Sequence, residues 1–501
     1  MRFLILNPKK PFAVLRLFFL VTAYGLLTLH ADSIAQTDFS LIRKFEHPDG
    51  IASRNDHFGE EVTVVGGNVL ISARDDDVSG PDAGAAYLFD RQGNLLTTFL
   101  NPSPQTSDGD VWFGNFVEPL GDDRVLIAAP LYDGGRMLVD TGIVYVFDLE
   151  GNLIKSIGNP TPFEFDEFGK RQIATNGHLI AIAAWKDETQ TPGTPSGAAY
   201  LYDSQGNLLQ EFFSPHAGTT ANRFGRALTF VGDDKLLVSD LDDNTGNEEA
   251  GAAFLFDLQG NLLQTFLNPT PLDQTQEAFG TTAISVGDRI VIGAAREGSI
   301  EQSSGAAYIY DLEGNLLKTI HEPEPTFMNL FGWSGAPIGD DRFIISSVLN
   351  DDLANGAGKA YLYDLEGNLL HTFVSPEPGI GQHFGRSFTT LEDDILISEE
   401  AGGPGSTGFG AVYMFQPIGM VGDADFDGEV GLEDFDILKR NFGTGDRFRH
   451  GDFDLDEQVG LTDFALLKDN FGAVEAVPEP SGWMLALVAA CGGWLLRRRA
   501  S

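Results

Sequence analysis

The sequence predicts an all-β fold, a seven-bladed β-propeller, followed by a small α-helical domain with two paired calcium loops. One observation is a Phe-Gly pair that recurs seven times at intervals of 52 to 56 residues. A second is that each copy contains four short strand-like segments separated by turn residues. A third is a pair of aspartate-rich loops within residues 421–472, beyond the last copy.

The repeat is most regular in a stretch such as GAAYLFDRQGNLLTTF (84–99), which returns with small changes at 197–212, 251–266 and 305–320. The Phe-Gly pairs that precede these stretches begin at Phe58, Phe113, Phe168, Phe224, Phe279, Phe331 and Phe384. Apolar and aromatic residues favour strands, and the aspartate and glycine between them predict a hairpin. We interpret the first glycine as a turn residue, the alanines as points where blades approach, and Tyr or Phe as core.

A single four-stranded sheet cannot bury both of its faces, so seven copies predict blades packed around an axis. The last copy (410–417) stops after its third strand, whereas residues 40–48 have the pattern of an orphan fourth strand. We therefore expect the N-terminal strand to complete the seventh blade, so that the propeller covers residues 38–416 and has no open sheet edge. An open solenoid is the alternative, but it would need capping repeats.

The Phe-Gly pair, the apolar strand and the Gly-x-x-Tyr-x-Phe strand together resemble the FG-GAP repeat family, known from the integrin α-subunit propeller and from exported bacterial proteins. Integrin-type repeats carry a calcium loop of the form DxDxDG between the first two strands. In this sequence that place holds short turns such as GGN (66–68) and GDDR (121–124). Calcium is therefore not expected in the blades.

A ligand is expected on the face that carries the connections between strands 2 and 3 and between blades, because these loops are long and variable. Trp112, Trp185 and Trp333 fall at or beside that face and are the candidate ligand-binding residues. An indole ring stacks on a sugar ring while nearby carboxylates bond its hydroxyls. The alternatives are that the tryptophans pack between blades and that the aspartates of these loops are solvated.

Catalysis is not expected. The nine histidines are scattered, and the one cysteine, Cys491, lies in a C-terminal apolar run. No serine stands in a nucleophile-elbow setting, and carboxylate pairs are too abundant for any one of them to indicate a glycosidase. We interpret the propeller as a binding or structural platform.

The two aspartate-rich loops have the ligand spacing of calcium sites, in which alternate positions of a tight loop direct oxygens at one centre. The candidate ligands are Asp423, Asp425, Asp427, the Glu429 carbonyl and Asp434 in the first loop, and Asp452, Asp454, Asp456, the Gln458 carbonyl and Asp463 in the second. Gly428 makes the sharp turn of the first loop. Glu457 stands where glycine is expected in the second, so we expect weaker binding there.

Each loop precedes an amphipathic stretch, and residues 421–472 together resemble a dockerin domain. The resemblance implies a cohesin-like partner. The usual Ser/Thr recognition pair is Leu432-Glu433 in the first loop and Leu461-Thr462 in the second. A calcium-stiffened spacer is therefore the alternative.

Both ends have the pattern of targeting segments. Residues 1–35 contain basic residues, an apolar run and then Ser33-Ile34-Ala35, which predicts a signal peptide cleaved after Ala35. Residues 477–501 contain Val477, Pro478, Glu479 and Pro480, then an apolar run and three arginines. This order resembles the PEP-CTERM sorting signal, which implies a sorting protease and a transient transmembrane helix; a retained short membrane anchor is the alternative.

Removing both ends takes away seven basic and two acidic residues, which leaves 25 basic and 71 acidic ones and a formal charge of −46. Such a surface repels nucleic acid and anionic lipid and favours cations. The body has no cysteine and therefore no disulfide.

These features predict an exported bacterial protein of the cell surface or extracellular matrix, with calcium as its cofactor. Its propeller is expected to recognise or adhere to an extracellular glycan or protein. One alternative is a component of extracellular polysaccharide degradation, either a hydrolase or a subunit carried into a complex by the dockerin-like domain. Another is an architectural envelope or matrix protein.

Overall fold

The computed structural model describes residues 38–50, 56–103, 111–133, 139–190, 194, 196–216, 223–245, 250–271, 277–400 and 410–474. Asp38–Pro417 forms one compact unit, and the chain from Ile418 belongs to another. The predicted signal peptide (1–35) and sorting signal (477–501) lie outside the described residues. Within the described ranges, no helix is long and apolar enough to cross a membrane.

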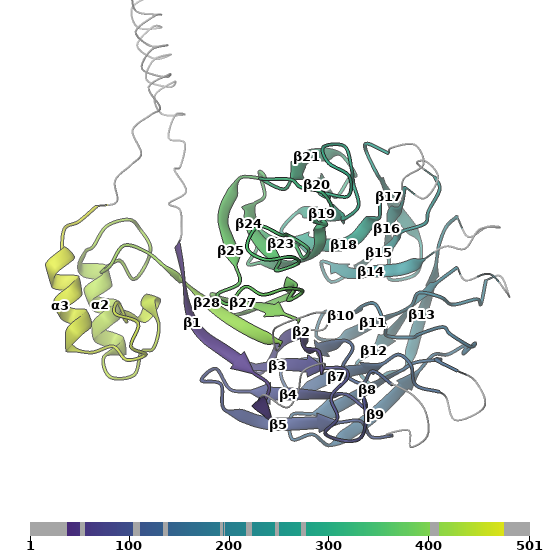
Figure 1. Cartoon of the computed structure of the whole chain (residues 1–501), viewed down its shortest axis with the longest axis horizontal. Helices are drawn as coiled ribbons and strands as arrows, with labels where there is room; N and C mark the ends of the chain where they lie inside the picture. Colours follow the sequence, from purple (N-terminus) through teal and green to yellow (C-terminus); the bar gives the residue numbers. More distant parts are fainter. Residues whose placement is uncertain are drawn as a thin grey trace, which may run out of the picture. The chain divides into compact units, whose positions relative to one another are not determined.

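Seven four-stranded sheets build the unit Asp38–Pro417, and Figure 1 shows them arranged around a ring. The first strands of the sheets are β2 (Phe58–Val65), β6 (Val117–Pro119), β10 (Ile173–Thr175), β14 (Phe224–Val231), β18 (Phe279–Val286), β22 (Phe331–Ile338) and β26 (Phe384–Leu391). The second strands are β3 (Asn68–Ala73), β7 (Arg124–Ala129), β11 (Leu179–Ala184), β15 (Lys235–Asp240), β19 (Arg289–Ala294), β23 (Arg342–Ser347) and β27 (Asp394–Glu399).

In six of the sheets the outer two strands come from the Gly-Ala-Ala-Tyr stretch and its variants, and in the seventh the fourth strand is β1. The third strands are β4 (Ala85–Phe89), β8 (Ile143–Asp148), β12 (Ala198–Asp203), β16 (Ala252–Asp257), β20 (Ala306–Asp311), β24 (Lys359–Asp364) and β28 (Ala411–Ile418). The fourth strands are β5 (Leu95–Leu100), β9 (Leu153–Gly158), β13 (Leu208–Phe213), β17 (Leu262–Leu267), β21 (Leu316–His321), β25 (Leu369–Val374) and β1 (Asp38–Glu46). The seven-bladed prediction is confirmed.

The seventh sheet has the order β1-β28-β27-β26, so the N-terminal strand completes the last blade as predicted. The first strand of that blade, β26, lies against β2 of the first blade, which closes the ring. The hairpin prediction also holds. In β20–β21, for example, the Asp311 carboxylate accepts the backbone N–H of Asn315 at 2.8 Å, and Gly314 has a φ of +84°.

The repeated tyrosines and phenylalanines form the core between neighbouring sheets, as expected. Tyr308 is fully buried, and its ring lies 5.7 Å from that of Phe279, the phenylalanine of the Phe-Gly pair in the same blade. The same edge-on or tilted contact recurs around the ring, for example between Phe331 and Tyr361. The apolar packing of the propeller is therefore a repeated unit, not one central core.

The first glycine of each Gly-Ala-Ala-Tyr stretch has a role beyond the turn that we expected from the sequence. A side-chain carbon on Gly305 would lie 2.0 Å from the carbonyl oxygen of Phe331, in the next blade. The same close approach pairs Gly84 with Phe113, Gly142 with Phe168, Gly197 with Phe224, Gly251 with Phe279, Gly358 with Phe384 and Gly410 with Phe58. The blades thus meet backbone to backbone at this glycine, which explains why the Gly and the Phe-Gly pair repeat together.

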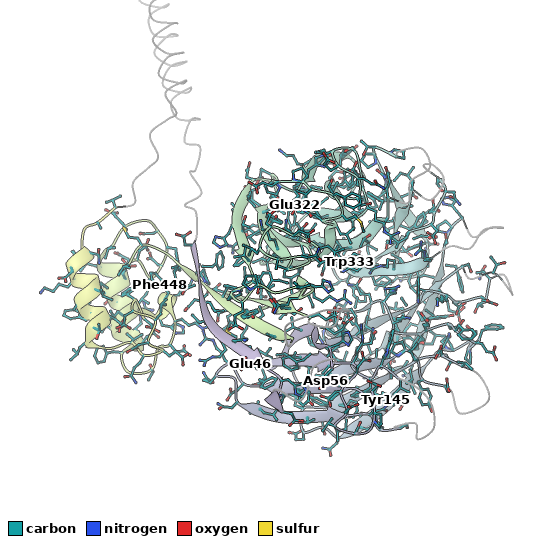
Figure 2. All side chains as sticks on the ribbon, viewed as in Figure 1. Glu46, Asp56, Tyr145, Glu322, Trp333 and Phe448 are labelled. Carbon is teal, nitrogen blue, oxygen red and sulfur yellow. The ribbon has the colours of Figure 1, made fainter. Side chains whose placement is uncertain are left out.

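The described part of the second unit contains two short α-helices, α2 (Leu432–Asn441) and α3 (Leu461–Asn470), and one turn of 3-10 helix, η2 (Phe448–His450). Its core is small. The buried apolar residues are Ala424, Val430, Leu438, Phe448, Phe453, Val459 and Leu467, and Figure 2 labels Phe448 among them. This small α-helical domain agrees with the predicted composition of the C-terminal region.

Candidate functional site

The first strands of all seven blades surround a cavity of about 640 Å³ on the propeller axis. Five of the seven inner strands begin with the Phe-Gly pair, which lies four or five residues before β6 and β10 in the other two. The glycine of the pair has a positive φ, +95° at Gly225. Pairing with the second strand is interrupted there, between Phe224 and Leu228 in β14. This bulge allows the side chains that follow the glycine to line the cavity.

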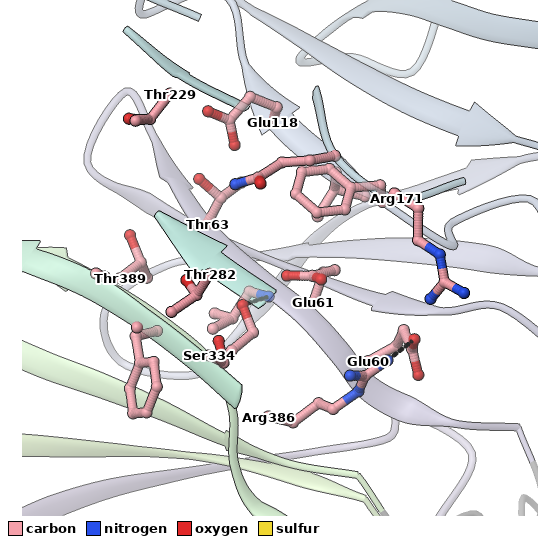
Figure 3. A pocket seen from close by; sticks show the side chains of 18 of the residues that line it. Glu60, Glu61, Thr63, Glu118, Arg171, Thr229, Thr282, Ser334, Arg386 and Thr389 are labelled. Atoms are coloured by element: carbon pink, nitrogen blue, oxygen red, sulfur yellow. Dashed lines mark hydrogen bonds and ion pairs between the residues drawn. The ribbon is translucent and has the colours of Figure 1, made fainter. Parts of the chain in front are cut away.

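The mouth of this channel is defined by the residue that follows each Phe-Gly pair. These seven residues are Glu60, Asn115, Lys170, Arg226, Thr281, Trp333 and Arg386, and all of them line the cavity. Because they follow the connections between blades, they lie on the variable face. Figure 2 labels Trp333 toward the middle of the ring, and Figure 3 labels Arg386 and Glu60 at one end of the cavity.

One half of the mouth, in the first and seventh blades, is electrically balanced. Arg74 Nη1 lies 2.8 Å from Glu60 Oε1, and Arg386 Nε lies 2.9 Å from Glu400 Oε2. Burial alone would raise the pKa of Glu60, but the charges of the two arginines lower it to about 2. The charged Glu60 carboxylate therefore offsets these arginines, and we call Glu60, Arg74, Arg386 and Glu400 the paired half.

The other half of the mouth is rich in arginine. A side cavity of about 110 Å³ joins the channel there, between the third, fourth, fifth and sixth blades. Its charged lining consists of Arg171, Arg223, Arg226 and Arg296, with Asp242 as the one carboxylate among the described lining residues. We call this set the arginine half.

The three tryptophans singled out from the sequence all lie at this mouth, on the predicted face. Trp112 and Trp333 line the channel, and Trp333 also lines the side cavity together with Trp185. Trp185 is buried, and its Nε1 donates to Glu167 Oε2 at 2.7 Å. The rings face cations: Arg171 lies 4.2 Å from the Trp185 centroid, and Lys170 lies 4.8 Å from that of Trp112. Their part in ligand binding stays a prediction.

Deeper in the channel lie two carboxyl groups that the sequence analysis did not single out. Burial raises the pKa of Glu61 to about 8, despite the positive charge of Arg386. Burial, with repulsion from Glu61, also raises the pKa of Glu118 to about 8. Both side chains project into the space shown in Figure 3. The raised pKa values reduce the negative charge that these groups offer to the arginines.

Aspartates of the variable loops are in part structural. The hydroxyl of Tyr87 donates to Asp76 Oδ2 at 2.5 Å, and that of Tyr200 donates to Asp187 Oδ2 at 2.7 Å. His47, Asp56 and Asp76 form the one group among the described propeller residues whose spacing could hold a metal ion. The contact of Asp76 with Tyr87 recurs in the third blade without a histidine, so we interpret this group as the first blade's version of a structural contact.

The acidic loops bring three carboxylates together in each case. Oxygens of Asp423, Asp425 and Asp434 all lie within 4.8 Å of one another in the first loop. Asp434 is held at the start of α2, where its carboxylate accepts the backbone N–H of Gly431 at 2.6 Å and that of Ala424 at 2.7 Å. Carboxylates at this spacing are the donor set that calcium prefers.

The second loop repeats this arrangement with Asp452, Asp454 and Asp463. Asp463 accepts the N–H of Gly460 at 2.7 Å, as its counterpart does in the first loop. The aspartates at the fifth position stand apart from these groups: Asp427 accepts the N–H of Glu429, and Asp456 that of Gln458. Metal ligation by these residues, and by the two predicted carbonyls, stays a prediction.

Glu457 occupies the position in the second loop at which the calcium-loop pattern has glycine, and its backbone conformation is the one that glycine favours. Gly428 has a φ of +84°, and Glu457 at the same place in the second loop has a φ of +65°. The left-handed conformation suits glycine but costs roughly 1–2 kcal/mol for a residue with a side chain. The second loop therefore adopts the fold of the first under backbone strain.

Comparison with known proteins gives one family match and similar solved structures. A family model described as FG-GAP repeat matches residues 44–89, which run from β1 to β4. No curated protein matches the sequence. Among solved structures, the chain is similar to the Pan2 WD40 domain of Neurospora crassa, with 12% identity and a TM-score of 0.46, over 76% of this chain and 95% of that one. It is also similar to Raptor of Chaetomium thermophilum, with 10% identity and a TM-score of 0.48, over 76% of this chain and 29% of that one.

The arginines were missed because the sequence analysis followed what repeats. The informative signal is what does not repeat: with the seven Phe-Gly pairs in register, the next two positions differ in nearly every blade. Arg171 and Arg226 are found there, as are the paired Glu60 and Arg386. In a closed propeller these variable positions converge on one axis, although they are far apart in the sequence.

Proposed function

We propose that this protein is an exported surface or matrix protein whose propeller binds an extracellular glycan or protein without chemical conversion. The observation that carries the proposal is the channel mouth, where Trp112, Trp333 and polar side chains from all seven blades converge on one cavity. Concave sites that combine aromatic rings with a few polar groups are typical ligand sites. The FG-GAP match suggests a binding or adhesion type of fold.

We assign the C-terminal region a supporting role. Residues 421–472 form a dockerin-like module in which calcium, held by the two acidic loops, stabilises a small core. The PEP-CTERM-like end would deliver the protein to the surface. A cohesin-like partner and a spacer role are both compatible with this module, and a calcium-dependent pull-down with α2 and α3 variants distinguishes them.

The test incubates full-length protein with neutral and charged polysaccharides, with calcium or with a chelator, and measures retained protein and released reducing sugar. Retention without release is the expected result. Trp333→Ala should weaken retention, whereas replacing an exposed aromatic residue that does not line the channel, Phe163→Ala, should not. Failure to bind any glycan or surface protein would contradict the proposal.

Hydrolysis of a polysaccharide is the second candidate. Its supporting observation is the pair Glu61 and Glu118, whose raised pKa values are typical of groups that act as general acids. Sugar release that is lost in Glu118→Gln would establish this activity and overturn the non-catalytic proposal.

A further inference from the structure

The arginine half of the mouth is unusual because of the overall charge of the chain. The full sequence contains 73 acidic and 32 basic residues, so carboxylates are available almost everywhere on the surface. The side cavity nevertheless has four arginines around it and one described carboxylate, Asp242. That carboxylate forms a two-pronged ion pair with Arg223, in which Arg223 Nη2 lies 2.5 Å from Asp242 Oδ1.

Arg171 and Arg226 differ from the arginines of the paired half. Among the described residues, neither of them forms an ion pair or a hydrogen bond with a carboxylate. The Nε of Arg171 is buried without a hydrogen-bond partner in this part of the chain. Burying a guanidinium without a counter-charge is unfavourable, so this arrangement lowers stability unless something else supplies the charge.

The surroundings add positive charge to this half. Burial, followed by the like charges of the neighbouring arginines, lowers the pKa of Arg226 to about 9. Glu167 acts on Arg171 only at a distance, because its carboxylate contacts Lys170 and Lys186 at 2.9 Å each. An arginine side chain keeps its proton in proteins, so the repulsion is not relieved by deprotonation.

The tryptophans hold the two guanidinium groups in place. Arg171 lies over the ring of Trp185 at 4.2 Å, and Arg226 lies 5.7 Å from the centroid of Trp333. A guanidinium stacked on an aromatic ring still presents its N–H groups at the edge, where they can form a fork with two oxygens. Trp185 and Trp333 therefore position the N–H donors of the two arginines.

We propose that Arg171 and Arg226 form a binding site for an oxyanion, a carboxylate or sulfate group carried by the ligand of the channel mouth. This site rests on the proposed glycan-binding function. The ligand is then an acidic glycan whose charged group enters the side cavity while its sugar rings lie in the wider channel. Bidentate contact between guanidinium and oxyanion is the strong recognition mode for such groups. Nucleic acid is disfavoured, because the rest of the surface is acidic.

The first experiment compares ligands that differ only in charge. Retention of full-length protein is measured on polygalacturonate and on its methyl ester, and on dextran sulfate and dextran. We expect retention on at least one charged polymer and at least tenfold weaker binding to its neutral counterpart. Preference for polygalacturonate identifies a carboxylate ligand, and preference for dextran sulfate identifies a sulfated one.

The variants are Arg226→Gln and Arg171→Gln, with Arg289→Gln as the matched control. Arg289 starts β19 at the tight-turn end of its blade and pairs with Asp288 at 2.6 Å. Binding of the charged polymer should fall roughly tenfold or more in either channel variant and stay unchanged in the control. Calcium bridging between acidic surfaces would survive these substitutions, so unchanged binding in both channel variants overturns the inference.

A second measurement separates this inference from the proposed function. Thermal unfolding is followed with galacturonate, galactose, sodium sulfate and sodium chloride. Galacturonate or sulfate should stabilise the wild type and not Arg226→Gln, and without ligand this variant should be at least as stable as the wild type. If the wild type binds no polymer but is still stabilised by small anions, the glycan-binding function is refuted and the anion site is supported. If the protein is retained equally on charged and neutral polymers, the anion site is refuted and the glycan-binding function is supported.

Discussion

The propeller joins its blades through glycine backbones, whereas the C-terminal domain gathers carboxylates around two loops. In the propeller, Gly305 packs directly against the backbone of Phe331 in the next blade, so both sides of the joint are supplied by the chain itself. In the acidic loops, Asp423, Asp425 and Asp434 lie within 4.8 Å of one another and repel unless a cation lies among them. The comparison teaches that the blade joints are completed by groups of the chain itself, whereas the carboxylate groups of the acidic loops are not.

The largest effect should come from filling a blade joint. Gly305→Ala places a carbon 2.0 Å from the Phe331 carbonyl oxygen and keeps an unfavourable φ of +90°. We expect a loss of roughly 4 kcal/mol or more in the free energy of unfolding, measured by denaturant titration. Gly177→Ala is the control, because Gly177 has a φ of +86° and nothing within 4 Å of the added carbon. It should cost roughly 1–2 kcal/mol. Similar losses in the two variants would show that conformation, not contact, explains the repeated glycine.

Chelation should separate the two regions. Removing calcium should unfold the C-terminal domain and leave the propeller transition unchanged, since saturating ligand at a hundredfold excess over its dissociation constant stabilises by about 2.7 kcal/mol. Calorimetry of the full-length protein with calcium or chelator measures both transitions. Asp434→Ala should abolish the response of the first loop, whereas Asp436→Ala, an exposed residue of the same helix, should retain it. A C-terminal transition that ignores calcium would refute the proposed metal role.

The pH should act mainly on the propeller. Burial raises the pKa of Asp166 from 3.8 to about 8, and its Oδ1 has no partner among the described residues. The folded state therefore binds a proton that the unfolded chain releases, so the free energy of unfolding falls as pH rises between 4 and 8 and then levels off. We expect a fall of roughly 1 kcal/mol per pH unit from this group.

Melting curves between pH 5 and 8 measure this slope. Asp166→Asn should make it shallower by roughly 1 kcal/mol per pH unit, because the amide keeps the hydrogen bond from Asn159 and cannot ionise. The rest of the slope comes from other buried carboxyl groups such as Glu61 and Glu118. Asp311→Asn is the control, since the pKa of this half-buried turn aspartate is lowered by its bonds to Asn315 and it stays charged over the whole range. A slope that is unchanged by Asp166→Asn would assign the titration to other groups.

The smallest effect should come from relieving the strain in the second acidic loop. Glu457→Gly replaces a side chain at a φ of +65° with the residue that the first loop has at this place. We expect the free energy of unfolding of the C-terminal domain to rise by about 1 kcal/mol. The relief of backbone strain contributes more than this, but the greater conformational freedom of glycine in the unfolded chain offsets part of it. The C-terminal transition in calorimetry reports the gain. A loss of stability would mean that the Glu457 side chain makes a compensating contact.

The fold could be predicted from the sequence because its determinants repeat. Seven Phe-Gly pairs in register, with turn aspartates such as Asp311, indicate the number of blades and their strands. The closing role of β1 could also be predicted, because the last copy lacks a fourth strand. The acidic loops were equally accessible, since Asp423 and Asp434 are close in the chain.

The channel site could not be predicted in the same way. Arg171 and Arg226 are adjacent only after seven sheets have closed into a ring, and single arginines carry no local pattern. The role of Gly305 could be predicted only in part. Its positive φ can be inferred from the turn, but its contact with Phe331 depends on how two blades pack against each other. Sequence periodicity therefore predicts that the repeats pack against one another, but it does not predict which residues of neighbouring repeats are in contact.

Closure of the ring by β1 has a consequence for the order of events during synthesis. This strand leaves the ribosome first, yet its partner β28 leaves last among the propeller strands. β1 must therefore remain unpaired until the seventh blade arrives, and pairing over such a separation is slow. A propeller cut short before β26 would present unpaired strands to proteases, so completion of the ring distinguishes finished chains from unfinished ones.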